Sequence, residues 1–393
     1  MKNTENKNHI LIITYNDYPV YEGTGVRINN LSKVFIEKGY DVIIFAPNID
    51  NNLVKQEYLP GCRIIRTNIY VPAFLKKNRI LARAWSMLIQ TFLTPLVYLK
   101  YMRKISIKFI LAVHIYSIPP AIMIKVFKRT KIVVDDHPPV SDMLRNDGSL
   151  VLAKLFTLFE KFLFKFCHDF IYTSPKLETY YKKRGAISTF YIQNGVDCNE
   201  FKPTKTDENK IVIFFNGSTF SKENCVAAAN FIEVGKKLIK TVGAHIEFRL
   251  ICWPEYNLPP SVRNDIINEK KWLKYKNGVK DIAAEIGCAD ITLLPFSQDH
   301  HHVHAHGIRL KVLEYMACGK LLISTSEGVE GTPGLIPNEH FLLAQSVDDI
   351  PKVISNIIQS PDKMKKIGEN ARNFVLNNYD WLTTSEEFIK AYD

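Results

Sequence analysis

The chain has 393 residues, a formal net charge of +11, 46% hydrophobic and 23% charged residues. This is an ordinary globular composition for two or three domains, without a low-complexity tract or a fixed-period repeat. No two of its seven cysteines have C-x-x-C spacing, which excludes a zinc ribbon or a redox pair. The polar start lacks the apolar core of a signal peptide, so we expect a cytoplasmic protein.

The first half of the chain alternates strands and helices. Residues 9–14 (HILIIT) predict a buried strand, and a loop with Gly23 and Gly25 follows. Residues 26–38 have helical apolar spacing and end at Gly39. The next strand, residues 41–46, completes a βαβ unit, which predicts a parallel sheet. Further strands are expected at 109–113, 131–134 and 168–173.

The second half repeats this pattern. Strands are expected at 210–216, 246–252, 291–295 and 320–324, and helices at 224–240 and 308–318. A polar run with Pro203 interrupts the order and suggests a boundary there. We therefore predict an α/β protein of two doubly wound domains, 1–203 and 204–378, facing across a cleft. A last helix, 379–393, is expected to return to the first domain, with Thr384 or Ser385 as its N-cap.

Three segments carry a family pattern. They are IQNGVDCNEFKP at 192–203, ADITLLPF at 289–296 and GIRLKVLEYMACGK at 307–320. In order and spacing they resemble glycosyltransferase family 4, which has the GT-B fold of two Rossmann-like domains. With the first glycine loop and Trp381, the resemblance spans nearly the whole chain. It implies transfer of a sugar from a nucleotide sugar, with retention of anomeric configuration.

The third segment predicts the donor site. A helix that begins near Gly307 would direct backbone N–H groups at a diphosphate, and Gly307 would permit close approach. By the resemblance, Glu314 accepts hydrogen bonds from the donor ribose; the alternative is a surface or helix-capping glutamate. Lys311 either contacts phosphate or is solvated.

A histidine run, DHHHVHAHG, precedes this helix. The family often has a glutamate eight residues before Glu314, where this chain has His306, so the donor sugar is left open. The run suggests either a metal site or a histidine-rich loop beside the donor. We expect no metal and no cofactor, with His304 or His306 hydrogen-bonded to the donor.

Other candidates lie at expected strand ends, where doubly wound sheets bind ligands. His137 follows the strand at 131–134, and the resemblance places a histidine there against the reacting sugar; the alternative is a loop histidine held by Asp135 or Asp136. Gly25 belongs to a loop that the family uses near the donor phosphates. Gly217, Ser218 and Lys222 follow the first strand of the second domain, where the family often has a basic residue.

The positive charge is concentrated in one segment. Residues 60–134 contain fourteen Lys or Arg and no Asp or Glu. Within it, the uncharged run 84–99 is shorter than a membrane span needs. It is flanked by five basic residues that predict contact with an anionic membrane surface: Arg79, Arg83, Lys100, Arg103 and Lys104. A buried helix with solvated basic ends is the alternative, and nucleic-acid signatures are absent.

Together these features predict a hexosyltransferase that is peripheral on the inner face of the membrane. Its donor is expected to be a nucleotide sugar, with UDP favoured over GDP, and its acceptor a sugar, lipid-linked or of a surface polysaccharide. A nucleotide-sugar epimerase would instead convert donor without acceptor. A non-catalytic membrane-associated subunit is the remaining alternative, motivated by His306.

Overall fold

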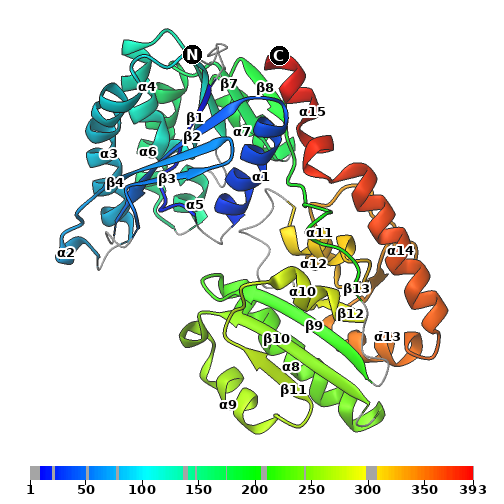
Figure 1. Cartoon of the computed structure of the whole chain (residues 1–393). Coiled ribbons are helices and arrows are strands. Elements are labelled where there is room, and N and C mark those ends of the chain that lie inside the picture. Colours follow the sequence, from blue (N-terminus) through cyan, green and yellow to red (C-terminus); the bar gives the residue numbers. More distant parts are fainter. Residues whose placement is uncertain are drawn as a thin grey trace. The chain divides into compact units, whose positions relative to one another are not determined.

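The computed structural model describes residues 9–19, 23–49, 53–76, 79–135, 140–146, 148–173, 175–204, 210–242, 245–297 and 308–392 (Figure 1). The chain divides into two compact units. Unit 1 comprises Met1–Gln193 and Ser385–Asp393, and unit 2 comprises Asn194–Thr384. The assignment of an acceptor domain and a donor domain to the two halves of the sequence stays a prediction.

Unit 1 is built on an eight-stranded sheet with the order β3-β4-β2-β1-β5-β6-β7-β8. Its strands are β1 His9–Ile13, β2 Asp41–Asn48, β3 Gln56–Leu59, β4 Cys62–Asn68, β5 Ile107–Val113, β6 Lys131–Asp135, β7 Asp169–Tyr172 and β8 Ser188–Tyr191. All pairings are parallel except that of the edge strand β3 with β4. The continuous apolar runs of the central strands suit a sheet that is buried on both faces.

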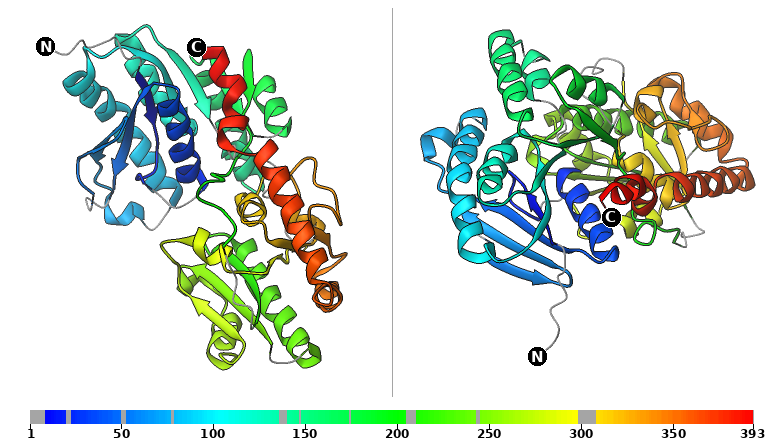
Figure 2. Two further views of the ribbon diagram at one scale, coloured as in Figure 1. Left: turned by 45° about the vertical axis from the view of Figure 1, so that its right-hand side comes forward. Right: turned by 90° about the horizontal axis from the view of Figure 1, so that it is seen from above.

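Helices cover both faces of this sheet. They are α1 Gly23–Glu37, α2 Ala73–Lys76, α3 Arg79–Met102, α4 Ile118–Phe127, α5 Val140–Asn146, α6 Leu150–Phe164, α7 Pro175–Lys183 and the end of α15 Trp381–Tyr392. Helix α1 and the end of α15 lie beside each other on one face (Figure 2). The rings of Phe35 in α1 and Phe388 in α15 both lie against Phe109 of β5, at 5.9 and 5.8 Å. The opposite face packs against α3, α4, α6 and α7 in one hydrophobic core.

Unit 2 has a parallel sheet of six strands with the order β11-β10-β9-β12-β13-β14. The strands are β9 Ile211–Ser218, β10 Ile246–Trp253, β11 Leu273–Lys276, β12 Ile291–Leu294, β13 Leu321–Ser324 and β14 Leu342–Leu343. The helices are α8 Lys222–Val242, α9 Pro260–Asn268, α10 Ile282–Gly287, α11 Leu310–Ala317, α12 Ser326–Val329, α13 Ile350–Ile357 and α14 Pro361–Asn378. Each unit is thus a doubly wound α/β layer, which confirms the predicted fold class.

Three local expectations were wrong. Gly23 and Gly25 lie in the first turn of α1 and not in a loop before it. Helix α11 begins at Leu310, with Arg309 as its N-cap. Helix α15 begins at Trp381, because the Asp380 carboxylate accepts the backbone N–H of Leu382 at 3.0 Å. Thr384 and Ser385 therefore lie inside that helix and cannot cap it.

Candidate functional site

The carboxyl end of β9 meets the first turn of α11 in unit 2. The Lys311 ammonium donates to the Asn216 carbonyl at 2.8 Å and to Asn224 Oδ1 at 2.9 Å. It also lies 4.7 Å from the ring centre of Phe215. These contacts tie α11 to β9 and to the first turn of α8. An ammonium has three N–H donors, so among the described residues these two hydrogen bonds leave one donor for a ligand.

Asn216 is fixed from a second side. Its backbone N–H donates to the Tyr315 hydroxyl at 3.1 Å, and that hydroxyl donates to Asn216 Oδ1 at 2.6 Å. The next residue, Gly217, has little room, since a Cβ there would lie 3.0 Å from Cβ and Cγ of Asn224. Gly217 therefore permits the close approach of Asn224 that completes the Lys311 contacts.

Glu314 lies one turn beyond Lys311 on α11. Burial raises the pKa of Glu314 to about 7, although the neighbouring Lys311 lowers it. Burial, with the charge of Arg309, lowers the pKa of Lys311 to about 8. Within the described part of the chain, the Glu314 carboxylate has no hydrogen-bond partner. A half-buried carboxylate without such a partner is able to accept hydrogen bonds from a ligand.

Arg309 was not anticipated from the sequence. Its guanidinium donates to Glu223 Oε2 at 3.1 Å and lies 4.2 Å from the ring centre of Phe296. Because Arg309 is the N-cap of α11 and Glu223 is in the first turn of α8, the pair joins the beginnings of two helices. The motif around Gly307 identified the helix but gave no sign of this partner.

The structure brings together part of the predicted donor site. Ser218 and Lys222 are exposed at the end of β9 and the start of α8, next in sequence to the Lys311 contacts. Four predicted residues lie outside the described residues: His137, His304, His306 and Gly307. Their roles stay predictions, as does the expectation of no metal. Among the described residues, no group of three or more His, Cys, Asp or Glu could hold a metal ion.

A buried ion pair lies at the carboxyl end of β6 in unit 1. Gly25 is buried in α1, and two residues later Arg27 Nε donates to Asp135 Oδ2 at 2.9 Å. Both side chains are only 1% exposed. Arg27 also donates to the Ile192 carbonyl at 3.0 Å. The pair joins the second turn of α1 to the end of β6, which in the sequence is two residues before His137.

His114 is a residue that the sequence interpretation missed. It directly follows β5, and its backbone has φ 69° and ψ 154°, a conformation that is costly for any residue except glycine. The backbone N–H of His114 donates to the backbone carbonyl of Asp135 at 2.9 Å. Its ring lies 4.5 Å from that of Tyr15 and 4.8 Å from that of Tyr116. A histidine after an apolar strand was the available signal, but the strain is visible only in the structure.

The predicted basic residues lie along and after α3. Lys100, Arg103 and Lys104 are exposed, and Lys100 Nζ lies 5.1 Å from the ring centre of Tyr101. Arg79 and Arg83 are in the same helix. No helix in the described ranges has both the length and the apolar character needed to cross a membrane.

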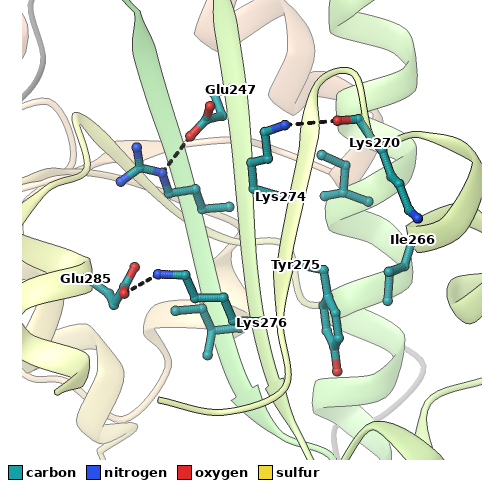
Figure 3. Close-up of a pocket in the computed structure, with 10 residues that line it drawn as sticks. Glu247, Ile266, Lys270, Lys274, Tyr275, Lys276 and Glu285 are labelled. Atoms are coloured by element: carbon teal, nitrogen blue, oxygen red, sulfur yellow. Dashed lines mark hydrogen bonds and ion pairs between the residues drawn. The ribbon is translucent and has the colours of Figure 1, made fainter. Parts of the chain in front are cut away.

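A cavity of about 760 Å³ lies elsewhere in unit 2 (Figure 3). It is lined by β10, β11 and neighbouring residues, and it shares none of the residues around Lys311 and Glu314. Several charged groups in it are already paired, including Arg249 with Glu247 at 2.7 Å, and Lys276 with Glu285. We do not assign the donor to this cavity.

Comparison with known proteins covers most of the chain. The model described as Glycosyltransferase Family 4 matches residues 21–200, and the model described as Glycosyl transferase-like matches residues 235–390. An uncharacterized glycosyltransferase of Methanocaldococcus jannaschii is 26% identical over 100 residues, 24% of each chain. The match thus spans about a quarter of that relative's length.

Solved structures resemble the whole chain. Sucrose-phosphate synthase from Thermosynechococcus elongatus superposes with a TM-score of 0.73 at 16% identity, covering 98% of each chain. HepE of Anabaena in complex with UDP has a TM-score of 0.66 at 14% identity, covering 98% of this chain and 99% of that one. At these identities, the likeness is one of fold.

The raised pKa of Glu314 predicts a pH dependence of stability. Between its ordinary value of about 4.3 and about 7, the folded state binds the proton more tightly than the unfolded state, so stability falls as pH rises. We expect Glu314→Gln to remove this loss and to stabilise the chain by roughly 1–2 kcal/mol at pH 7.5, with little effect near pH 4.5. The free energy of unfolding is measured for both proteins by urea unfolding at several pH values. Glu369→Gln, an exposed change on α14, is the control, and parallel pH curves for wild type and Glu314→Gln would contradict the assignment.

Proposed function

The chain belongs to glycosyltransferase family 4 and has the GT-B fold, and from this premise we propose that it transfers a hexosyl group from a UDP-sugar to an acceptor with retention. The observation that carries the proposal is the Glu314 carboxylate beside the Lys311 ammonium at the carboxyl end of β9. UDP is favoured over GDP because HepE, which has the same fold, binds UDP.

The diphosphate is proposed to lie at the end of β9. The third N–H of Lys311, the exposed Lys222 and the hydroxyl of Ser218 supply donors and positive charge there. The first turn of α8 adds backbone N–H groups and the positive end of a helix dipole. Gly307, His304 and His306, which precede α11, are proposed to complete this side of the donor site.

The nucleoside is proposed to bind through one carboxylate and one aromatic ring. Glu314 has two oxygens, which suit the two vicinal hydroxyls of a ribose. Trp253, at the end of β10, is 54% exposed and pairs in register with Ser218. Its ring contacts that of Phe220 at 5.6 Å, which holds the indole at the edge where a base can stack on it.

Within unit 1, His114 is proposed to contact a sugar hydroxyl, and the predicted residues His137 and Gly25 are proposed to contribute to the same subsite. The strained backbone of His114 holds its imidazole at the carboxyl end of β5, and the Arg27–Asp135 pair fixes the adjacent strand end. His114 is a suitable hydrogen-bond partner for a sugar hydroxyl because each ring nitrogen can donate or accept.

For the chemical step we propose front-face transfer. The acceptor oxygen forms its bond to the anomeric carbon while the bond from that carbon to the diphosphate oxygen breaks. The acceptor proton passes to the departing diphosphate. Positive charge from Lys311 and Lys222 stabilises the negative charge that develops on the leaving group.

The acceptor is proposed to be lipid-linked or part of a surface polysaccharide, with the enzyme on the cytoplasmic face of a membrane. The support is the segment 60–134, which has basic residues and no acidic ones. Arg79, Arg83, Lys100, Arg103 and Lys104 would then face anionic headgroups.

The donor assignment predicts a defined pattern of nucleotide release. Purified chain is incubated with UDP-, GDP- and ADP-sugars, with and without bacterial lipid extract. We expect release from a UDP-sugar, increased by lipid, and lost by roughly a hundredfold in Glu314→Ala because the ribose contact is gone. Glu369→Ala should release nucleotide as wild type does. Conversion of donor without acceptor would favour an epimerase, and neither release nor a donor-induced thermal shift would favour a non-catalytic subunit.

The strain at His114 gives a second prediction. His114→Gly and His114→Ala both remove the imidazole, so both should lose transferase activity by at least about tenfold. Since only glycine adopts φ 69° and ψ 154° without cost, we expect the glycine variant to be more stable than the alanine variant by about 1–2 kcal/mol. Asn338→Gly, at the other described non-glycine residue with positive φ, should leave activity unchanged. Full activity in either His114 variant would contradict the proposed contact.

A further inference from the structure

Helix α6 of unit 1 carries a row of exposed apolar side chains. Val151, Leu155, Leu158 and Phe162 are 73, 57, 63 and 55% exposed. Their spacing of four, three and four residues places them on one face of the helix. An apolar row of this length is unusual on a surface that stays in contact with water.

The opposite face of α6 holds the helix to its unit. Ala153, Glu160 and Phe164 are buried there. Glu160, which is the only acidic residue of α6, accepts hydrogen bonds from Arg184 Nε at 2.6 Å and from the Ser141 hydroxyl at 2.8 Å. The only carboxylate of α6 is therefore buried and paired with Arg184, and the exposed face of the helix carries no acidic side chain.

A row of lysines lies beside the apolar row. The exposed lysines are Lys154 and Lys161 in α6 and its C-cap residue, Lys165. Their spacing of seven and four residues places them on one face of the helix. The helix thus presents three faces: one packed on the sheet, one apolar and one basic. Helices that lie in the interface of an anionic bilayer combine such apolar and basic faces.

Helices α3 and α4, which pack in the same core as α6, also carry exposed apolar side chains. Leu88, Phe92 and Leu96 of α3 are 49, 59 and 61% exposed at a spacing of four residues. At the end of α4, Val126 and Phe127 are 75 and 51% exposed. Lys125 Nζ donates to the Phe166 carbonyl at 2.9 Å and so joins the end of α4 to the segment after α6. Helices α3, α4 and α6 cover the same face of the sheet (Figure 1).

We propose that the outer faces of α6, α4 and α3 form a docking surface for an anionic lipid bilayer. The apolar side chains enter the boundary between headgroups and acyl chains, and the lysines contact the headgroups. The charge argues for lipid over a second copy of this chain, since a symmetric dimer through this surface would place basic rows near each other. The inference deepens the proposed membrane contact and does not require sugar transfer.

Vesicle flotation of the full chain tests this surface. We expect binding to vesicles of phosphatidylcholine with phosphatidylglycerol, and much weaker binding to phosphatidylcholine alone. The double variant Leu155→Asp and Leu158→Asp should bind at least about a hundredfold more weakly. Replacement of Lys154, Lys161 and Lys165 by Ser should also cost roughly a hundredfold and abolish the preference for anionic lipid. Ile267→Asp on α9 of unit 2, which is 62% exposed, should bind as wild type does.

Two parallel measurements keep the result interpretable. Thermal unfolding should be unchanged in all variants, since the substituted side chains are exposed. Donor hydrolysis in lipid-free buffer should also be unchanged, so a failure of the docking surface is distinct from a failure of the transferase assignment. Equal binding of wild type and both α6 variants would overturn the proposal. So would a wild-type dimer that the variants convert to monomer without any vesicle binding, which would assign the surface to a protein contact.

Discussion

The contacts of one ammonium group organise the candidate donor site. Lys311 donates to the carbonyl of Asn216 and to the side chain of Asn224, so that α11, β9 and α8 meet at a single polar point. Gly217 lacks the side chain that would prevent this approach, and Tyr315 fixes Asn216 from the other direction. These contacts hold the polar groups in place without a ligand, and such preorganisation would strengthen electrostatic stabilisation of a leaving group.

The same physical arrangement explains why Glu314 is unusual. Its carboxylate is held in a poorly solvated place beside Lys311, and burial has the larger effect on its pKa. A structural glutamate in such a place would be hydrogen-bonded to the protein, as Glu160 of α6 is. A ligand with vicinal hydroxyls would supply the hydrogen bonds that the described chain does not. Binding of such a ligand would offset the stability that burial of this carboxylate costs, a trade-off that is common at functional sites.

The fold was predicted well from the sequence, for a physical reason. Apolar strands and helix-stopping glycines are local signals, so the elements around 41–46 and 246–252 were found with errors of two residues or fewer. The segment around Glu314 was found because its helix carries a family pattern. Features that depend on distant partners were not predicted: the Arg309–Glu223 pair, the strain of His114, and the capping of α15 by Asp380 in place of Thr384. Nor could the sequence show that the Leu155 side of α6 points outward, since a helix of Leu, Phe and Lys also fits a buried position.

A crystal structure of the chain with UDP would show directly whether the end of β9 and helix α11 bind the donor nucleotide. We expect ribose hydroxyls within hydrogen-bond distance of the Glu314 carboxylate and diphosphate oxygens next to Lys311 and Lys222. A well-ordered UDP bound elsewhere, with Glu314 contacting no part of it, would show that this is not the donor site.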